Sequence, residues 1–150
     1  MPISSAKLDT ALHVLKGAVE KVLRAKTTTG VAENDDFSGR LVVEFDRKPS
    51  AEEMEQVQAE ANSKVEENAV VENMELDRDE AEAKFGKKIY DKFPVPEHIK
   101  TLKIVKIPDW NINCCIGKHL QSTGLLGKIK IDKFRYRGSR NELEISFSLH

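Results

Sequence analysis

Residues 128–137 and 142–149 alternate polar and apolar side chains, and this pattern constrains the fold more than any other in the 150-residue chain. Alternation with a period of two is typical of a strand with one buried face. The residues between the two runs, from Gly138 to Asn141, are of turn-forming types. The pattern therefore predicts a β-hairpin within an antiparallel sheet.

Residues 8–23 carry the clearest helical pattern. Their apolar side chains recur at spacings of three and four, which gathers them on one side of a helix. They are Leu8, Ala11, Leu12, Leu15, Ala18, Val19, Val22 and Leu23. A second helix is predicted to run to about residue 68, because Ser50 and Glu53 have the spacing of a capping box. A short third helix is predicted between Asp77 and Gly86.

Further strands are predicted at residues 41–45, 70–76 and 102–107. Residues 26–40 are predicted to form turns and loose strand, and residues 86–101 a long loop. Helices and strands that alternate along the chain and end in an antiparallel pair indicate an α+β domain. The length suits one domain over residues 1–150. The chain has no run of about 18 apolar residues, so no membrane span is expected.

The net charge of −1 hides an uneven distribution. Residues 51–100 carry 7 basic and 14 acidic side chains, whereas residues 101–150 carry 9 and 4. Local charge can steer a polyanion to a protein of low net charge. The alternative is that the basic side chains form the solvated face of an amphipathic strand.

Two short spacings bring together side chains of the types that bind zinc. Cys115 and His119 are four residues apart, and so are Asp9 and His13. Together these residues offer one sulfur, two nitrogens and one oxygen, which predicts a zinc site with three or four protein ligands. Each has a simpler alternative: His13 as a packing residue, Asp9 as a carboxylate favoured by the helix dipole, and a chance Cys-x3-His spacing.

Gly17 continues the helix surface that carries His13. A glycine inside a helix costs about 1 kcal/mol relative to alanine. We therefore expect another backbone or a ligand to approach closely at this position.

The two cysteines, Cys114 and Cys115, are adjacent and cannot bridge each other without strain. Cys114 is expected to be a small apolar filler that points away from Cys115. Cysteine usage of this kind makes the cytoplasm the expected compartment.

Five segments between residues 8 and 149, in the right order, resemble one family. They are residues 9–19, 43–50, 90–96, 110–119 and 123–131. Each is similar to a segment of the short AlaX proteins, free-standing relatives of the editing domain of alanyl-tRNA synthetase. The resemblance implies the fold of that editing domain, the second additional domain of alanyl- and threonyl-tRNA synthetases. In this fold an antiparallel or mixed sheet packs around a long N-terminal helix and a second helix.

The family binds zinc through His-x3-His and Cys-x3-His. By position, His13, Cys115 and His119 match three of these ligands, and Asp9 occupies the fourth place, where the family has histidine. Three outcomes stay open: zinc with Asp9 as an oxygen ligand, zinc with three protein ligands and water, or a weakened site.

The resemblance implies a zinc-dependent trans-editing hydrolase that deacylates alanine tRNA mischarged with serine or glycine. Thr29 is a candidate for contacting the serine side chain. The acceptor end of the tRNA is the expected partner. It is expected to contact Lys128, Lys130, Arg135 and Arg137, provided that the strand register flips between the first pair and the second. The other basic cluster near His13 consists of Lys16, Lys21 and Arg24.

Two alternative functions remain. One is a non-catalytic tRNA- or acyl-binding homologue with a degraded zinc site. The other is an editing domain with a different amino-acid specificity.

Overall fold

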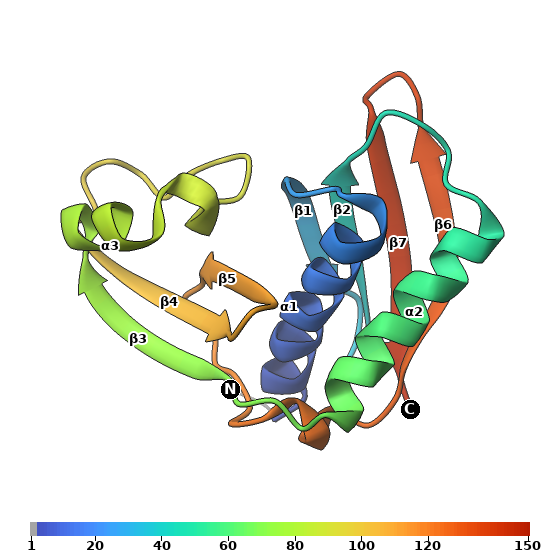
Figure 1. The fold of residues 1–150 in the computed structure, drawn as a ribbon, viewed down its shortest axis with the longest axis horizontal. Coiled ribbons are helices and arrows are strands. Elements are labelled where there is room, and N and C mark those ends of the chain that lie inside the picture. Colours follow the sequence, from blue (N-terminus) through green and yellow to red (C-terminus); the bar gives the residue numbers. More distant parts are fainter. Residues whose placement is uncertain (1–2) are drawn as a thin grey trace.

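Two antiparallel sheets lie on either side of the long helix α1 (Ile3–Leu23) in the computed structural model, which describes residues 3–150, with side chains from residue 6 (Figure 1). The larger sheet has the order β1-β2-β7-β6. Its strands are β1 (Thr28–Glu33), β2 (Ser38–Glu44), β6 (Ile129–Arg137) and β7 (Glu142–Leu149). The smaller sheet consists of β3 (Glu72–Asp77), β4 (Thr101–Ile107) and β5 (Asn111–Cys114). The α+β class is confirmed, and the strands are divided between two sheets.

The two helices after α1 begin at the predicted caps. Helix α2 (Ala51–Glu66) has the full capping box: the Glu53 amide donates to the Ser50 hydroxyl at 3.0 Å, and the Ser50 amide donates to the Glu53 carboxylate at 2.9 Å. Helix α3 (Arg78–Phe85) is capped by the Asp77 carboxylate and ends at Gly86, whose φ is 75°. Short 3-10 helices follow at Lys87–Ile89 and Thr123–Leu126.

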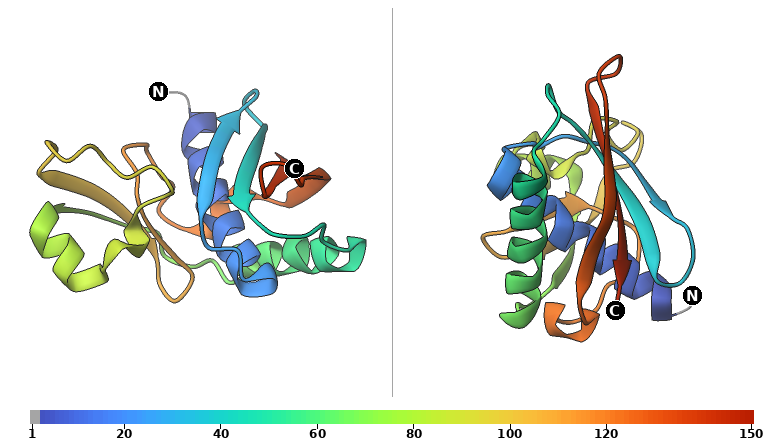
Figure 2. Two further views of the ribbon diagram at one scale, coloured as in Figure 1. Left: turned by 90° about the horizontal axis from the view of Figure 1, so that it is seen from above. Right: turned by 90° about the vertical axis from the view of Figure 1, so that its right-hand side faces the viewer.

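Helices α1 and α2 cover one face of the larger sheet (Figure 2). Strand β7 buries Leu143, Ile145 and Phe147 against them, while the residues between point to the other face. This burial of alternate residues is why polar and apolar side chains alternate so regularly along β7. Among the described residues, no helix is long and apolar enough to cross a membrane.

The predicted hairpin of β6 and β7 is confirmed, and it contains a bulge. The pairing shifts between Ile131 and Lys133, so Asp132 is an extra residue in β6. The bulge reverses the alternation, and Phe134 and Tyr136 after it pack against the core. The register of β6 therefore flips. This flip is the condition under which the basic residues before and after the bulge can lie on one face of the hairpin.

Residues 26–40 contain more strand than the sequence predicts. Residues 28–33 form β1, which pairs with β2 with a register shift between Thr28 and Gly30, and Thr28 is buried opposite Val43. Gly30 and the Asn34-Asp35-Asp36 run indicate turns, but the threonines favour a strand, and pairing with β2 extends the segment into β1. The predicted loop 86–101 contains one fully buried anchor, Ile89.

Strand β4 joins the two halves of the molecule because it buries apolar side chains on both of its faces. Leu102 and Ile104 lie in a small core with α3. Val105 and Ile107 on the opposite face belong to the main core with α1 and α2. Cys114 packs against the small core and Cys115 against the main one, so the expectation that they point apart is confirmed.

Candidate metal centre

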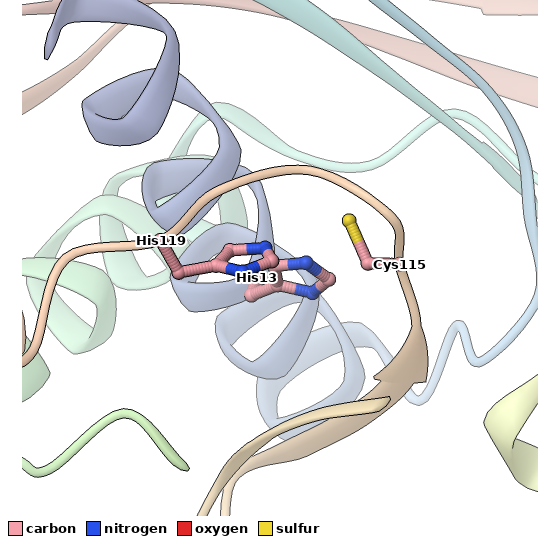
Figure 3. A group of neighbouring side chains, drawn as sticks. All are labelled: His13, Cys115 and His119. Atoms are coloured by element: carbon pink, nitrogen blue, oxygen red, sulfur yellow. The ribbon is translucent and has the colours of Figure 1, made fainter. Parts of the chain in front are cut away.

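The side chains of His13, Cys115 and His119 converge beside the middle of α1 (Figure 3). Their ligand atoms lie within 4.8 Å of one another. His13 comes from α1, Cys115 directly follows β5, and His119 lies in the loop after it. The fold therefore brings together two motifs about a hundred residues apart.

Trp110 holds the turn between β4 and β5 against α1. Its indole nitrogen donates to the carbonyl oxygen of Val14 at 2.9 Å. The indole lies so close to Gly17 that an added Cβ would overlap it. The close approach expected at Gly17 is present, but the Trp110 side chain makes it, and not another backbone or a ligand. At the far end of the motif, the Leu120 amide donates to the Thr10 hydroxyl at 2.9 Å.

Two asparagines orient the imidazoles. The Nδ1 of His13 lies 3.0 Å from Oδ1 of Asn111, and the Nδ1 of His119 lies 3.1 Å from Oδ1 of Asn73. With the amide oxygen as acceptor, each Nδ1 carries a proton and each Nε2 keeps a free lone pair. Second partners of this kind commonly fix the tautomer of histidines that bind metals.

The Nε2 atom of His119 is buried and has no hydrogen-bond partner. A buried polar atom without a partner costs about 1–3 kcal/mol, so it calls for an explanation. A metal ion held by Nε2 of His119, by His13 and by the Cys115 sulfur would provide the missing partner. These residues therefore fit zinc in both ligand type and orientation.

The histidines are neutral near pH 7. Burial, helped by the charge of Lys16, lowers the pKa of His13 to about 3, and burial lowers the pKa of His119 to about 4. Burial raises the pKa of the Cys115 thiol. In the metal-free protein the imidazoles are therefore ready to bind a cation, whereas the thiol must first lose a proton.

Asp9 lies outside the group of three. Burial, followed by the charge of the neighbouring Glu33 of β1, raises the pKa of Asp9 to about 6. It also faces Gly117, where an added Cβ would overlap the carboxylate. The structure thus brings three of the four predicted ligands together, and the role of Asp9 as a fourth ligand stays a prediction.

One turn beyond His13, Lys16 belongs to a network of polar side chains. Its ammonium group lies 3.3 Å from the Asp91 carboxylate and donates to the amide oxygen of Asn113 at 3.1 Å. The amide nitrogen of Asn113 donates to the same carboxylate at 3.0 Å. The network fastens the segment after the first 3-10 helix to both α1 and β5.

The remaining predicted site residues lie on the larger sheet. Thr29 donates to the carbonyl oxygen of Val42 at 3.4 Å and is half-buried. Lys130 and Arg135 are exposed on the sheet face opposite the helices, and Lys128 is exposed just before β6. Arg137 is paired with Glu144 at 2.9 Å. Their predicted contacts with substrate and tRNA stay predictions.

No role at the cluster was predicted from the sequence for three nearby residues. Asn111 stands in the segment before Cys115, but an asparagine there looks like any strand-end residue. Asn73 and Glu33 lie on other strands, and only pairing in three dimensions brings them to the site.

Residues 102–145 match the family model of the threonyl and alanyl tRNA synthetase second additional domain. Alanine–tRNA ligases align over most of the chain. The enzymes from Thermococcus kodakarensis and Pyrococcus furiosus are 35% and 37% identical over 129 residues, which is 86% of this chain. The enzyme from Pyrobaculum aerophilum is 37% identical over 131 residues, or 85% of the chain. The chain spans only 14% of the length of these ligases.

Proposed function

Because the chain is related to the alanyl-tRNA synthetases and has the editing type of domain that they share with threonyl-tRNA synthetases, we propose that it hydrolyses mischarged alanine tRNA. The substrate is the ester between serine or glycine and the ribose at the tRNA 3′ end. Water cleaves the bond between the acyl carbon and the ribose oxygen, releasing the amino acid and the free tRNA. The cytoplasm, as the place of this reaction, is part of the proposal.

The convergence of His13, Cys115 and His119, with one buried imidazole nitrogen left without a partner, carries the proposal. These three residues would hold zinc. A bound zinc ion would polarise the ester carbonyl or orient the substrate. Asn111 and Asn73 keep the imidazoles in the tautomer that presents Nε2.

The residues around the cluster contribute charge and position. Asp9 places a carboxyl group beside Cys115, and Glu33 adds a second charge next to Asp9, which favours a cationic group such as the α-ammonium of an aminoacyl ester. Lys16, Asp91 and Asn113 fix the segments that frame α1. Thr29 is our candidate for contact with a serine hydroxyl.

Alanine tRNA needs such an activity for a physical reason. A pocket shaped for alanine excludes the smaller glycine poorly, and serine adds only a hydroxyl group. A second site that binds the hydroxyl group can remove the error after charging. This argument supports serine as an amino acid released, and the poor exclusion of glycine makes glycine the second.

The decisive experiment measures deacylation of Ser-tRNA(Ala), Gly-tRNA(Ala) and Ala-tRNA(Ala) together with the zinc content of protein purified without added metal. We expect zinc in the wild-type protein, hydrolysis of the mischarged tRNAs, and loss of both in His119→Ala. The exposed His98→Ala is the matched control and should change neither. Hydrolysis that persists in His119→Ala after chelation would contradict the proposal.

The position of Asp9, outside the group of three candidate ligands and beside Glu33, favours a second candidate, a non-catalytic homologue with a weakened metal site. It predicts tRNA binding without deacylation and little retained zinc. An editing domain of different specificity would instead hold zinc and deacylate other members of a panel of mischarged tRNAs. A tRNA-binding assay and a panel of other mischarged tRNAs, added to the deacylation and zinc measurements, therefore separate all three functions.

A further inference from the structure

A cavity of about 950 Å³ lies beside the metal cluster but is not lined by Cys115 or His119. On one side it is bounded by the C-terminal parts of α1 and α2. On the other it is bounded by residues 85–91 and by the turn between β4 and β5. We call this cavity the lysine groove.

The lysine groove carries an excess of positive charge, with eight Lys or Arg side chains against five Asp or Glu. Three of the lysines are paired with acidic groups of the groove itself, as in Lys16–Asp91. The other five basic side chains form no ion pair among the described residues. They are Arg24, Lys26, Lys87, Lys88 and Lys106. Their charge is available to a polyanion.

Aromatic side chains are interspersed among these charges. Phe85, Tyr90 and Trp110 all line the groove and are half-buried. Lysine ammonium groups lie over two of the rings: Lys64 is 4.8 Å from the centre of Trp110, and Lys106 is 5.9 Å from that of Phe85. A basic groove with aromatic rings is the arrangement that binds single-stranded nucleic acid, through phosphate contacts and base stacking.

The groove is connected to the metal cluster through one side chain. Asn111 lines the groove, and its Oδ1 holds Nδ1 of His13 at 3.0 Å. Lys16, one helical turn after His13, also lines it. A strand lying in the groove would therefore end one side chain away from His13.

We propose that the lysine groove binds the single-stranded 3′ end of an RNA. This inference rests on the proposed function, which requires such an end at the metal cluster. The basic face of the β6–β7 hairpin is the competing surface. It lies on the side of the larger sheet away from α1, and Glu144 already neutralises Arg137 there.

Fluorescence anisotropy of an uncharged, labelled eight-nucleotide RNA ending in CCA, measured without zinc, tests the proposal. Lys87→Glu with Lys88→Glu should weaken binding at least tenfold and lower the salt slope by about two. Phe85→Leu should weaken binding about fivefold or more and leave the salt slope unchanged, because only stacking is lost. The exposed pair Lys48→Glu with Lys100→Glu is matched in charge and should change affinity less than twofold.

A second pair, Lys130→Glu with Arg135→Glu, tests the hairpin face in the same assay. Loss of binding in this pair with none in the groove pair would overturn the proposal, and so would wild-type affinity in both. Circular dichroism of each variant excludes unfolding as the cause. Because the RNA carries no amino acid, groove-dependent binding by a protein without deacylase activity would support the groove and contradict only the proposed activity.

Discussion

At the scale of single residues, the protonation state of each side chain determines how the candidate metal centre can bind a cation. Asn111 and Asn73 hold protons on the Nδ1 atoms, and burial keeps both imidazoles neutral. The Cys115 thiol, in contrast, keeps its proton at neutral pH because burial raises its pKa above the usual 9.0. Zinc must therefore displace a proton from the Cys115 thiol, but none from the two imidazoles, when it binds.

We predict that zinc binding at pH 7 releases about one proton, from Cys115. At pH 5.5 the histidines are still neutral, but Asp9, with a pKa of about 6, is mostly protonated. If Asp9 is a ligand, release should rise to nearly two protons at pH 5.5 and stay near one in Asp9→Asn. Calorimetry in buffers of different ionisation enthalpy measures the count. Equal release by both proteins at pH 5.5 would remove Asp9 from the ligand set.

A second test replaces Asp9, the candidate fourth ligand. Asp9→His should raise zinc affinity by about tenfold, because imidazole suits a site with a thiolate better than a carboxylate does. Competition with a chromophoric chelator gives the affinity. Asp9→Asn serves as the control that removes the charge without adding an imidazole. An affinity unchanged in Asp9→His would mean that residue 9 does not reach the metal.

At the scale of secondary-structure elements, the contact between α1 and the β4–β5 turn decides whether the two motifs meet. Trp110 lies against Gly17 and donates to Val14, so the indole sets the distance between helix and turn. Cys115 follows the same strand pair. A change at Gly17 should therefore affect metal binding without touching a ligand.

We predict that Gly17→Ala destabilises the protein by about 1–3 kcal/mol, since the new methyl group must displace the indole. Helix propensity alone would favour the alanine by about 1 kcal/mol, so the sign of the change is diagnostic. Zinc affinity should fall as well. Gly30→Ala is the control, because no atom within 4 Å would meet its added Cβ. Urea unfolding and chelator competition measure both effects, and a stabilised Gly17→Ala would contradict the packing role of Trp110.

The elements also show what sequence patterns can and cannot predict. The hairpin of β6 and β7 and the Ser50 cap follow from local periodicity and spacing, and both are confirmed. Residues 26–40 were predicted only as turns and loose strand, because the polar residues of β1 depend on pairing with β2. In this segment Glu33 was missed, although it lies beside Asp9. Asn73 lies on a strand remote in sequence, so no spacing could link it to His119.

At the scale of the whole molecule, two cores share one strand. Leu102 and Ile104 of β4 belong to the small core, whereas Val105 and Ile107 belong to the main core. The smaller sheet also carries Cys115 at its end and, through Asn73, orients His119. Damage to the small core should therefore propagate to the metal cluster, although none of the three candidate ligands lies in that core.

We predict that the two halves unfold together. Ile104→Ala removes a fully buried side chain from the small core and should lower the free energy of unfolding by about 2–5 kcal/mol. The fluorescence of Trp110, the one tryptophan, and the far-ultraviolet circular dichroism should shift to the same lower urea midpoint. Ile99→Ala is the control, because Ile99 is exposed and its loss should change stability by about 0.5 kcal/mol or less. Separate transitions for the two probes would show that β4 does not couple the cores. The convergence of the two motifs would then depend on contacts with α1, such as those of Trp110 and Leu120, and not on the small core.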